Sequence, residues 1–135
     1  MRARHFTVTA AFILLSTASA FATTPSARVI DWASAEKNYI AAVQSQNTGL
    51  QQSAAQFIGE YRLKGAVSEL ARVLREDPVE TTRMKAAASL VRIGGDEALT
   101  AVREAVLFDG SDKVVRFCEK LMESASEQHD LSMKN

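Results

Sequence analysis

The stretch AAQFIGEYRLKGAVSEL, residues 54–70, returns 32 positions later in degenerate form as AAASLVRIGGDEALTAV, residues 86–102. The positions that keep an apolar or small residue are, in pairs, Ala54 and Ala86, Ile58 and Leu90, Tyr61 and Ile93, Val67 and Leu99, and Leu70 and Val102. The polar residues between these positions differ between the two copies. A fixed period between about 20 and 50 residues marks a repeat architecture, in which each unit buries its apolar face against its neighbour.

Apolar residues recur at helical spacing in six segments, and short breaks separate them. The expected helices cover about 31–44, 49–61, 65–76 and 78–93, the stretch between Asp96 and Asp109, and 111–123. No window alternates with a period of two, so no sheet is expected. Because the connections are short, successive helices should be antiparallel neighbours.

Turn residues predict where these helices begin and which side they bury. The residues at expected N-cap positions are Asn47, Asp77, Asp96 and Asp109. The fourth helix gives the strongest such signal, because Pro78 follows Asp77 at the first helical position and Glu80 completes a capping box. In the second helix the spacing predicts a buried side made of Leu50, Ala54, Phe57, Ile58 and Tyr61.

The N-terminus has the layout of a secretory signal peptide, which we assign to residues 1–22. Arg2 and Arg4 precede an apolar run over about 6–15, and small residues close it. Cleavage after Ala22 is preferred and cleavage after Ala20 is the alternative. The apolar run is shorter than the roughly 20 residues that span a bilayer, which disfavours the other interpretation, a membrane anchor. We therefore expect a periplasmic or secreted protein, with residues 23–30 as a disordered lead.

Charge and cysteine content narrow the function further. The chain has 16 basic and 16 acidic residues, and removal of Arg2 and Arg4 with the signal peptide leaves a net charge of −2. This balance provides no basic field for nucleic acid. The single cysteine, Cys118, has no partner for an internal disulfide. We expect the exported domain to be held together by packing alone.

The order of residues within the repeat resembles the HEAT-like repeat. Its elements here are Ala54–Ala55, Ile58–Gly59, Tyr61, the turn 62–64, and Ala66–Val67 followed by Leu70. The second copy departs where Val91 replaces the small glycine and at Asp96–Glu97. The resemblance covers about 47–123, and the run 108–118 is also similar to small exported bacterial HEAT-repeat proteins.

This resemblance implies an all-α fold, a short α-solenoid of antiparallel helix pairs with about six helices. We place this domain at 31–124, with a half-unit at each end, and expect residues 125–135 to form a frayed tail. Families of this kind usually act as protein-binding scaffolds. Some members of the wider group assist bilin attachment, but no residue here points to a chromophore, and no cofactor is expected.

No motif for catalysis, for a cofactor or for a metal is present in the sequence. His129 falls in the expected tail, where no neighbour would orient it. Cys118 falls at the repeat position of Ala54 and Ala86, so we expect a small buried residue and not a reactive thiol. An intermolecular disulfide is the alternative if the last helix leaves Cys118 exposed. No enzymatic activity is therefore expected.

The remaining candidates are polar residues on the second helix of each unit, which the resemblance places on the concave surface. We expect partner contacts from Arg72, Arg75, Arg103 and Glu104. The preferred function is a non-catalytic, exported protein-interaction module or scaffold. Two alternatives stay open, an accessory or regulatory subunit of an envelope enzyme or stress pathway, and a structural cap that forms homo-oligomers through its open ends.

Overall fold

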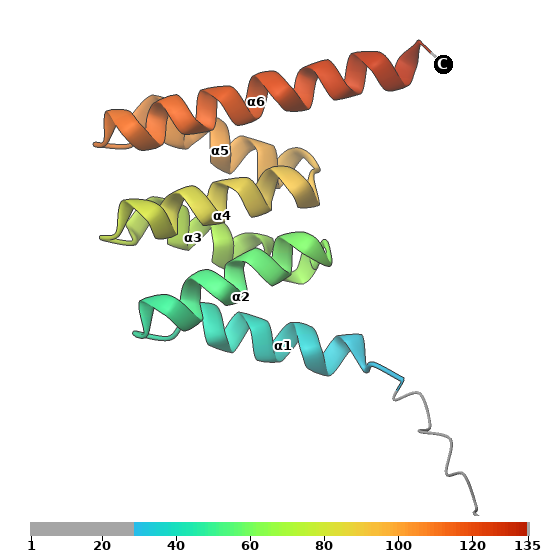
Figure 1. Cartoon of the computed structure of the whole chain (residues 1–135), viewed down its shortest axis with the longest axis vertical. Helices are drawn as coiled ribbons and strands as arrows, with labels where there is room; N and C mark the ends of the chain where they lie inside the picture. Colours follow the sequence, from blue (N-terminus) through green and yellow to red (C-terminus); the bar gives the residue numbers. More distant parts are fainter. Residues whose placement is uncertain (1–28, 135) are drawn as a thin grey trace, which may run out of the picture.

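The protein is a stack of helices in two layers, as the predicted all-α solenoid requires (Figure 1). The computed structural model describes residues 29–134. Its elements are α1 (Trp32–Val43), α2 (Thr48–Glu60), the 3₁₀ helix η1 (Lys64–Ala66), α3 (Val67–Glu76), α4 (Glu80–Ile93), α5 (Asp96–Phe108) and α6 (Asp112–Met133). No strand occurs in this range. The assigned signal peptide and residues 23–28 of the lead lie outside it, and residues 29–30 are exposed without regular structure.

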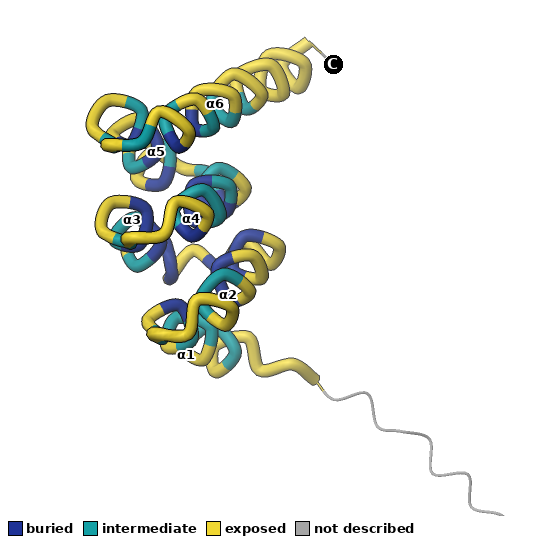
Figure 2. The backbone as a smooth tube through the Cα atoms, turned by 60° about the vertical axis from the view of Figure 1, so that its left-hand side comes forward, coloured by how far each residue is buried: buried dark blue, intermediate teal, exposed yellow. Residues whose placement is uncertain are grey.

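The helix boundaries repeat with the period seen in the sequence. α2, α4 and α6 begin at positions 48, 80 and 112, and α1, η1 and α5 begin at 32, 64 and 96. α2, α4 and α6 form one layer, which we call the first layer, and α1, α3 and α5 form the second layer (Figure 2). Each unit is therefore one helix from each layer, and neighbouring units are related by 32 residues.

A continuous core runs between the two layers, seen as dark blue segments in Figure 2. Its largest fully buried side chains are aliphatic and come from both layers, among them Ile58, Leu70, Leu74, Leu90, Val102 and Val114. Each such side chain contributes about 1.5–3 kcal/mol through burial. The repeated alanine pairs 54–55 and 86–87 are also buried, and their small volume lets the helices approach closely.

α2 and α4 approach closely where Gly59 meets Ser89. The Ser89 hydroxyl donates a hydrogen bond of 2.7 Å to the carbonyl oxygen of Ala55. A Cβ atom on Gly59 would lie 2.6 Å from Ser89 Oγ and 2.8 Å from Ser89 Cα, so only glycine fits. On α4 the matching position holds Val91, which is partly buried and packs against the core.

One residue in each loop between units makes the same backbone contact. The side chains of Ser45, Asp77 and Asp109 accept hydrogen bonds from the amide two residues later, at 3.1, 2.9 and 2.9 Å. Each carboxylate also binds the preceding helix of the layer formed by α2, α4 and α6. Gln51 Nε2 donates to Asp77 at 2.8 Å, and Arg83 Nε donates to Asp109 at 2.8 Å. These loops thus lock successive units in one register.

These contacts correct the predicted helix starts. Asn47 does cap α2, since its side chain accepts from the Leu50 amide at 3.0 Å. α4 instead begins at Glu80 with Val79 as N-cap, so Asp77 and Pro78 lie before the helix. The Asp77 carboxylate is occupied by the Val79 amide and by Gln51, which a local capping signal does not reveal.

Two further N-cap predictions are wrong. Asp96 is the first residue of α5, and Gly95 stands at the N-cap with φ of 89°, a conformation that favours glycine. Asp109 ends α5, and Ser111 precedes α6. Gly94 and Gly95 do end α4, as expected. The predicted buried side of α2 is also only partly right, because Leu50, Phe57 and Tyr61 are exposed.

The C-terminal residues are the other correction. Residues 125–133 continue α6, whereas we expected a frayed tail over 125–135. Extending an existing helix needs no new nucleus, and this segment contains neither glycine nor proline. Its residues are almost all exposed, so they add little packing. None of the helices within 29–134 is both long enough and apolar enough to span a bilayer.

Candidate protein-binding surface

A groove of about 110 Å³ opens between α3 and α5 on the second layer. Small and aliphatic residues from both helices line it, namely Ala71, Leu74, Ala101 and Ala105. Arg75 from α3 and Glu104 from α5 bring opposite charges to the same groove, and Phe108 adds an aromatic ring. The surface therefore combines an apolar lining with one positive and one negative side chain.

The last turn of α5 exposes two large apolar side chains, Phe108 beside this groove and Leu107 on the side of the helix that faces α6. Phe108 is 80% exposed and Leu107 is 72% exposed. One unit earlier, the same two positions on α3 hold Arg75 and Glu76. Adjacent exposed apolar residues of this size mark interaction surfaces more often than single scattered ones. Phe108 was not among the contact residues predicted from the sequence, although the loss of charge relative to Glu76 could have identified it.

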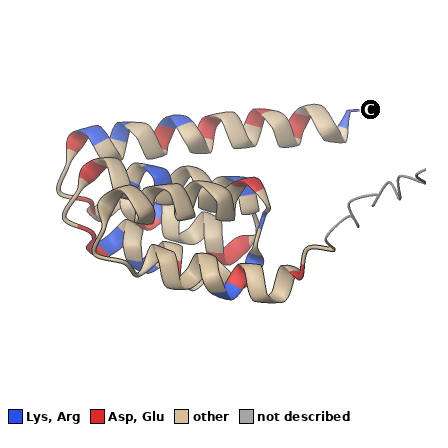
Figure 3. Ribbon diagram, turned by 60° about the horizontal axis from the view of Figure 1, so that its bottom comes forward, with Lys and Arg blue, Asp and Glu red and all other residues tan. Residues whose placement is uncertain are grey.

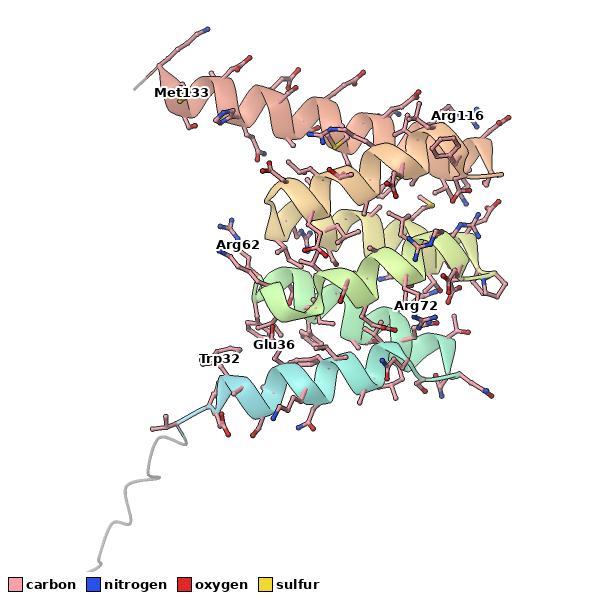
Figure 4. All side chains as sticks on the ribbon, turned by 180° about the vertical axis from the view of Figure 1, so that it is seen from behind. Trp32, Glu36, Arg62, Arg72, Arg116 and Met133 are labelled. Atoms are coloured by element: carbon pink, nitrogen blue, oxygen red, sulfur yellow. The ribbon has the colours of Figure 1, made fainter. Side chains whose placement is uncertain are left out.

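The structure brings two of the four predicted contact residues, Arg75 and Glu104, to the groove. Arg72, labelled in Figure 4, belongs to α3 but does not line the groove. Its guanidinium is held by neighbours on its own helix. Its Nε donates to Glu69 Oε1 at 2.9 Å, and Nη1 lies 3.5 Å from Glu76 Oε2. The hydrogen bond to Glu69 raises the pKa of Arg72.

Arg103 lies on the other side of α5 from the groove. It lines a shallow hollow between α5 and α6 together with Leu107 and Met122. Its guanidinium reaches Thr100 Oγ1 at 3.4 Å, a weak contact along the same helix. Any partner that bound the groove would therefore meet Arg75 and Glu104 first.

A buried ion pair supports one end of the groove. Asp109 lines the groove but is only 6% exposed, and both of its oxygens accept hydrogen bonds from Arg83. Burial by itself would raise the pKa of Asp109, but the hydrogen bonds from Arg83 and from the Ser111 amide outweigh it and lower the pKa. This pair holds the α5–α6 loop against α4 and so positions Phe108.

The residues with chemical potential are placed as follows. Cys118 is fully buried in α6, and burial raises the pKa of its thiol to about 11, which agrees with the predicted structural role. His129 is exposed on the last turns of α6. Residues 29–134 contain no group of three or more His, Cys, Asp and Glu side chains that could hold a metal ion. Basic and acidic side chains are interspersed over this part of the chain (Figure 3).

Comparison with known proteins agrees with the architecture. A family model described as HEAT repeats matches residues 36–121, which is more than half of the chain. No curated protein and no solved structure matches the chain. HEAT repeats generally mediate protein interactions and are typically non-catalytic. The 32-residue helix pairs, the two layers and this match together place the chain in the HEAT-repeat family.

Proposed function

We propose that this chain is a non-catalytic, exported interaction module that binds a segment of a partner protein in the groove between α3 and α5. The observation that carries the proposal is the exposure of Phe108 beside a groove lined by small residues. Exposed aromatic side chains next to a small pocket are typical of the few residues that supply most of the binding energy at protein interfaces.

The lining defines the kind of segment that fits. Ala71 and Ala101 leave room for an incoming apolar side chain, and Phe108 can cover it. Arg75 and Glu104 carry opposite charges, so a segment with one acidic and one basic residue flanking its apolar anchor complements them. Rim charges of this kind affect association rate and specificity more than affinity.

Export is supported by the N-terminal layout, in which a positive region, a short apolar run and small residues follow each other over 1–22. The intact mass of protein recovered after expression from its own leader tests this part. A mass that begins at Thr23, in the envelope or medium fraction, is the expected result. A mass that includes residues 1–22 would contradict export by cleavage.

The binding proposal is tested by comparing what two variants retain from the native envelope or medium. Phe108→Ser removes the exposed ring, and Leu131→Ser removes a similarly exposed apolar side chain from the α6 tail as a matched control. Because both side chains are exposed, neither change should alter stability by more than about 0.5 kcal/mol. We expect a partner that wild type and Leu131→Ser retain and that Phe108→Ser loses.

The charges give a second arm. Arg75→Glu should weaken the same partner with a stronger effect at low salt, because exposed charges are screened within about 10 Å at 0.1 M salt. Equal retention of every protein by wild type and by Phe108→Ser would refute the groove as the binding site. Retention that follows Arg103 and not Arg75 would move the site to the hollow between α5 and α6.

A further inference from the structure

The N-terminal end of the stack exposes a cluster of aromatic and aliphatic side chains, which we call the aromatic end. It consists of Trp32 and Tyr39 on α1 and of Leu50, Phe57 and Tyr61 on α2. Trp32 and Tyr61 have ring centroids 4.9 Å apart, and Phe57 and Tyr61 are stacked at 6.1 Å. Four of the five side chains are between 40% and 50% exposed, and Tyr39 is half-buried.

The residues 32 and 64 positions later show whether the equivalent surface is covered in the other units. On α4, Thr82 and Ser89 are fully or almost fully buried against α2, where they bond to Gln52 and Ala55. The matching positions on α6 are Val114, which is fully buried, and Leu121, which packs against the core. On α2 the same positions are Leu50 and Phe57. Leu50 and Phe57 of the aromatic end thus occupy positions that the preceding helix of the same layer covers in each later unit.

The opposite end of the stack is built differently. The α2 residues that face α4 are Gln52, Ala55, Gln56 and Gly59. The corresponding residues of α6 are charged and exposed, and they are Arg116, Glu119, Lys120 and Glu123. Arg116 and Trp32 mark the two ends in Figure 4. A polar outer face of this kind is what a terminal repeat needs for solubility, and the aromatic end has no equivalent.

The chain's own N-terminal residues do not offer a cover once residues 1–22 are removed, a step that rests on the proposed export. Residues 23–28 read Thr-Thr-Pro-Ser-Ala-Arg and have no large apolar side chain, and Val29 and Ile30, which follow them, are exposed. Head-to-tail stacking of two copies would press the aromatic end against the charged α6 face and leave those charges without partners, which is costly. Pairing the same apolar surface of two copies avoids this cost.

We propose that the aromatic end is the interface of a two-fold homodimer, in which the α1–α2 surfaces of two copies cover each other. An isologous contact uses one self-complementary patch on both subunits and closes at two copies. Trp, Tyr and Phe are the residues enriched at the centres of such interfaces, where charged residues are depleted. The charged α6 face remains in water at both outer ends of the dimer.

The test uses the exported protein recovered after expression with its own leader. Sedimentation over a concentration series gives the mass in solution, and the emission maximum of Trp32, the single tryptophan, reports on the interface. We expect a dimer whose dissociation on dilution shifts the emission to longer wavelength. Phe57→Ser, which copies the residue of α4 at that position, should weaken dimerisation at least about tenfold. Lys120→Ser, on the charged end, is the control and should leave it unchanged.

A monomer at every concentration, or a dimer that Phe57→Ser leaves intact, would overturn the proposal. Species larger than two copies that Lys120→Ser disrupts would show head-to-tail stacking and overturn it too. The intact mass of the same sample tests export separately, since a chain that keeps residues 1–22 refutes cleavage whatever its sedimentation. Loss of a partner by Phe108→Ser is likewise independent of the dimer, because Phe108 does not belong to the aromatic end.

Discussion

Gly59→Ala is the sharpest test of how α2 and α4 pack. In an exposed helix this change should stabilise by about 1 kcal/mol, because alanine is the better helix former. At this position the new methyl would lie 2.8 Å from the Ser89 Cα, a backbone atom that cannot rotate away. The two helices must therefore separate, and the sign of the effect reverses.

The size of the effect follows from two terms that oppose the gain in helix propensity. Overpacking of this kind costs about 1–3 kcal/mol. Separation also breaks the 2.7 Å hydrogen bond from Ser89 to Ala55, and a buried hydroxyl without a partner costs about 1–3 kcal/mol. With the propensity gain of about 1 kcal/mol subtracted, we expect a net destabilisation of about 1–5 kcal/mol.

Thermal and urea unfolding of the purified protein measure this difference. Gly49→Ala is the matched control, because it is the same change on the same helix and its nearest contact would be an ordinary 3.4 Å to Asn47 Oδ1. The control should be neutral or slightly stabilising. If Gly59→Ala behaved like Gly49→Ala, the close approach of α2 and α4 would be wrong, and with it the register of the stack.

Two further predictions concern titratable groups. Asp109→Asn should lower stability by about 3 kcal/mol near neutral pH, because Arg83 loses the charge that compensates its burial. The pKa of Asp109 in the folded protein lies below its ordinary value of 3.8. The stability that the ion pair contributes is therefore complete above pH 3.8 and disappears as the pH falls through the pKa of the folded state. The melting temperatures of wild type and variant should converge in acid, and a difference that stays constant would refute the pairing. Cys118, with a pKa of about 11, should be about a hundredfold less ionised at pH 8 than an ordinary thiol. It should label with a thiol reagent only on unfolding, whereas immediate stoichiometric labelling of the native protein would contradict its burial.

The repeat itself was predictable from the sequence, because each apolar position is specified at least twice. A pattern that returns after 32 residues predicts both the helix pairs and the relation between units, and the buried Cys118 follows from the same register. The helix starts were less predictable. Asp77 carries a strong local capping signal, yet its carboxylate is taken up by the Val79 amide and by Gln51, 26 residues away.

The surface residues were predictable only in part, because helical spacing identifies the apolar side of a helix but not whether a neighbour covers it. Phe57 and Leu50 have the spacing of core residues, and they are exposed since no described helix precedes α1. Of the charged candidates, Arg75 and Glu104 reached the groove. Arg72 did not, because Glu69 and Glu76 lie within reach on its own helix.

The two proposed surfaces use different parts of the same repeat, and this has a consequence for binding. The groove lies between α3 and α5, and the aromatic end belongs to α1 and α2, with no residue in common. A two-fold contact through the aromatic end therefore leaves one groove free on each copy. Two linked sites raise the apparent affinity for a clustered or dimeric partner by about 10²–10⁴ without any new contact, provided that the geometry lets both engage. A groove of about 110 Å³ offers little contact area alone. Pairing two copies would therefore raise the apparent affinity of this short solenoid for a partner without enlarging either groove.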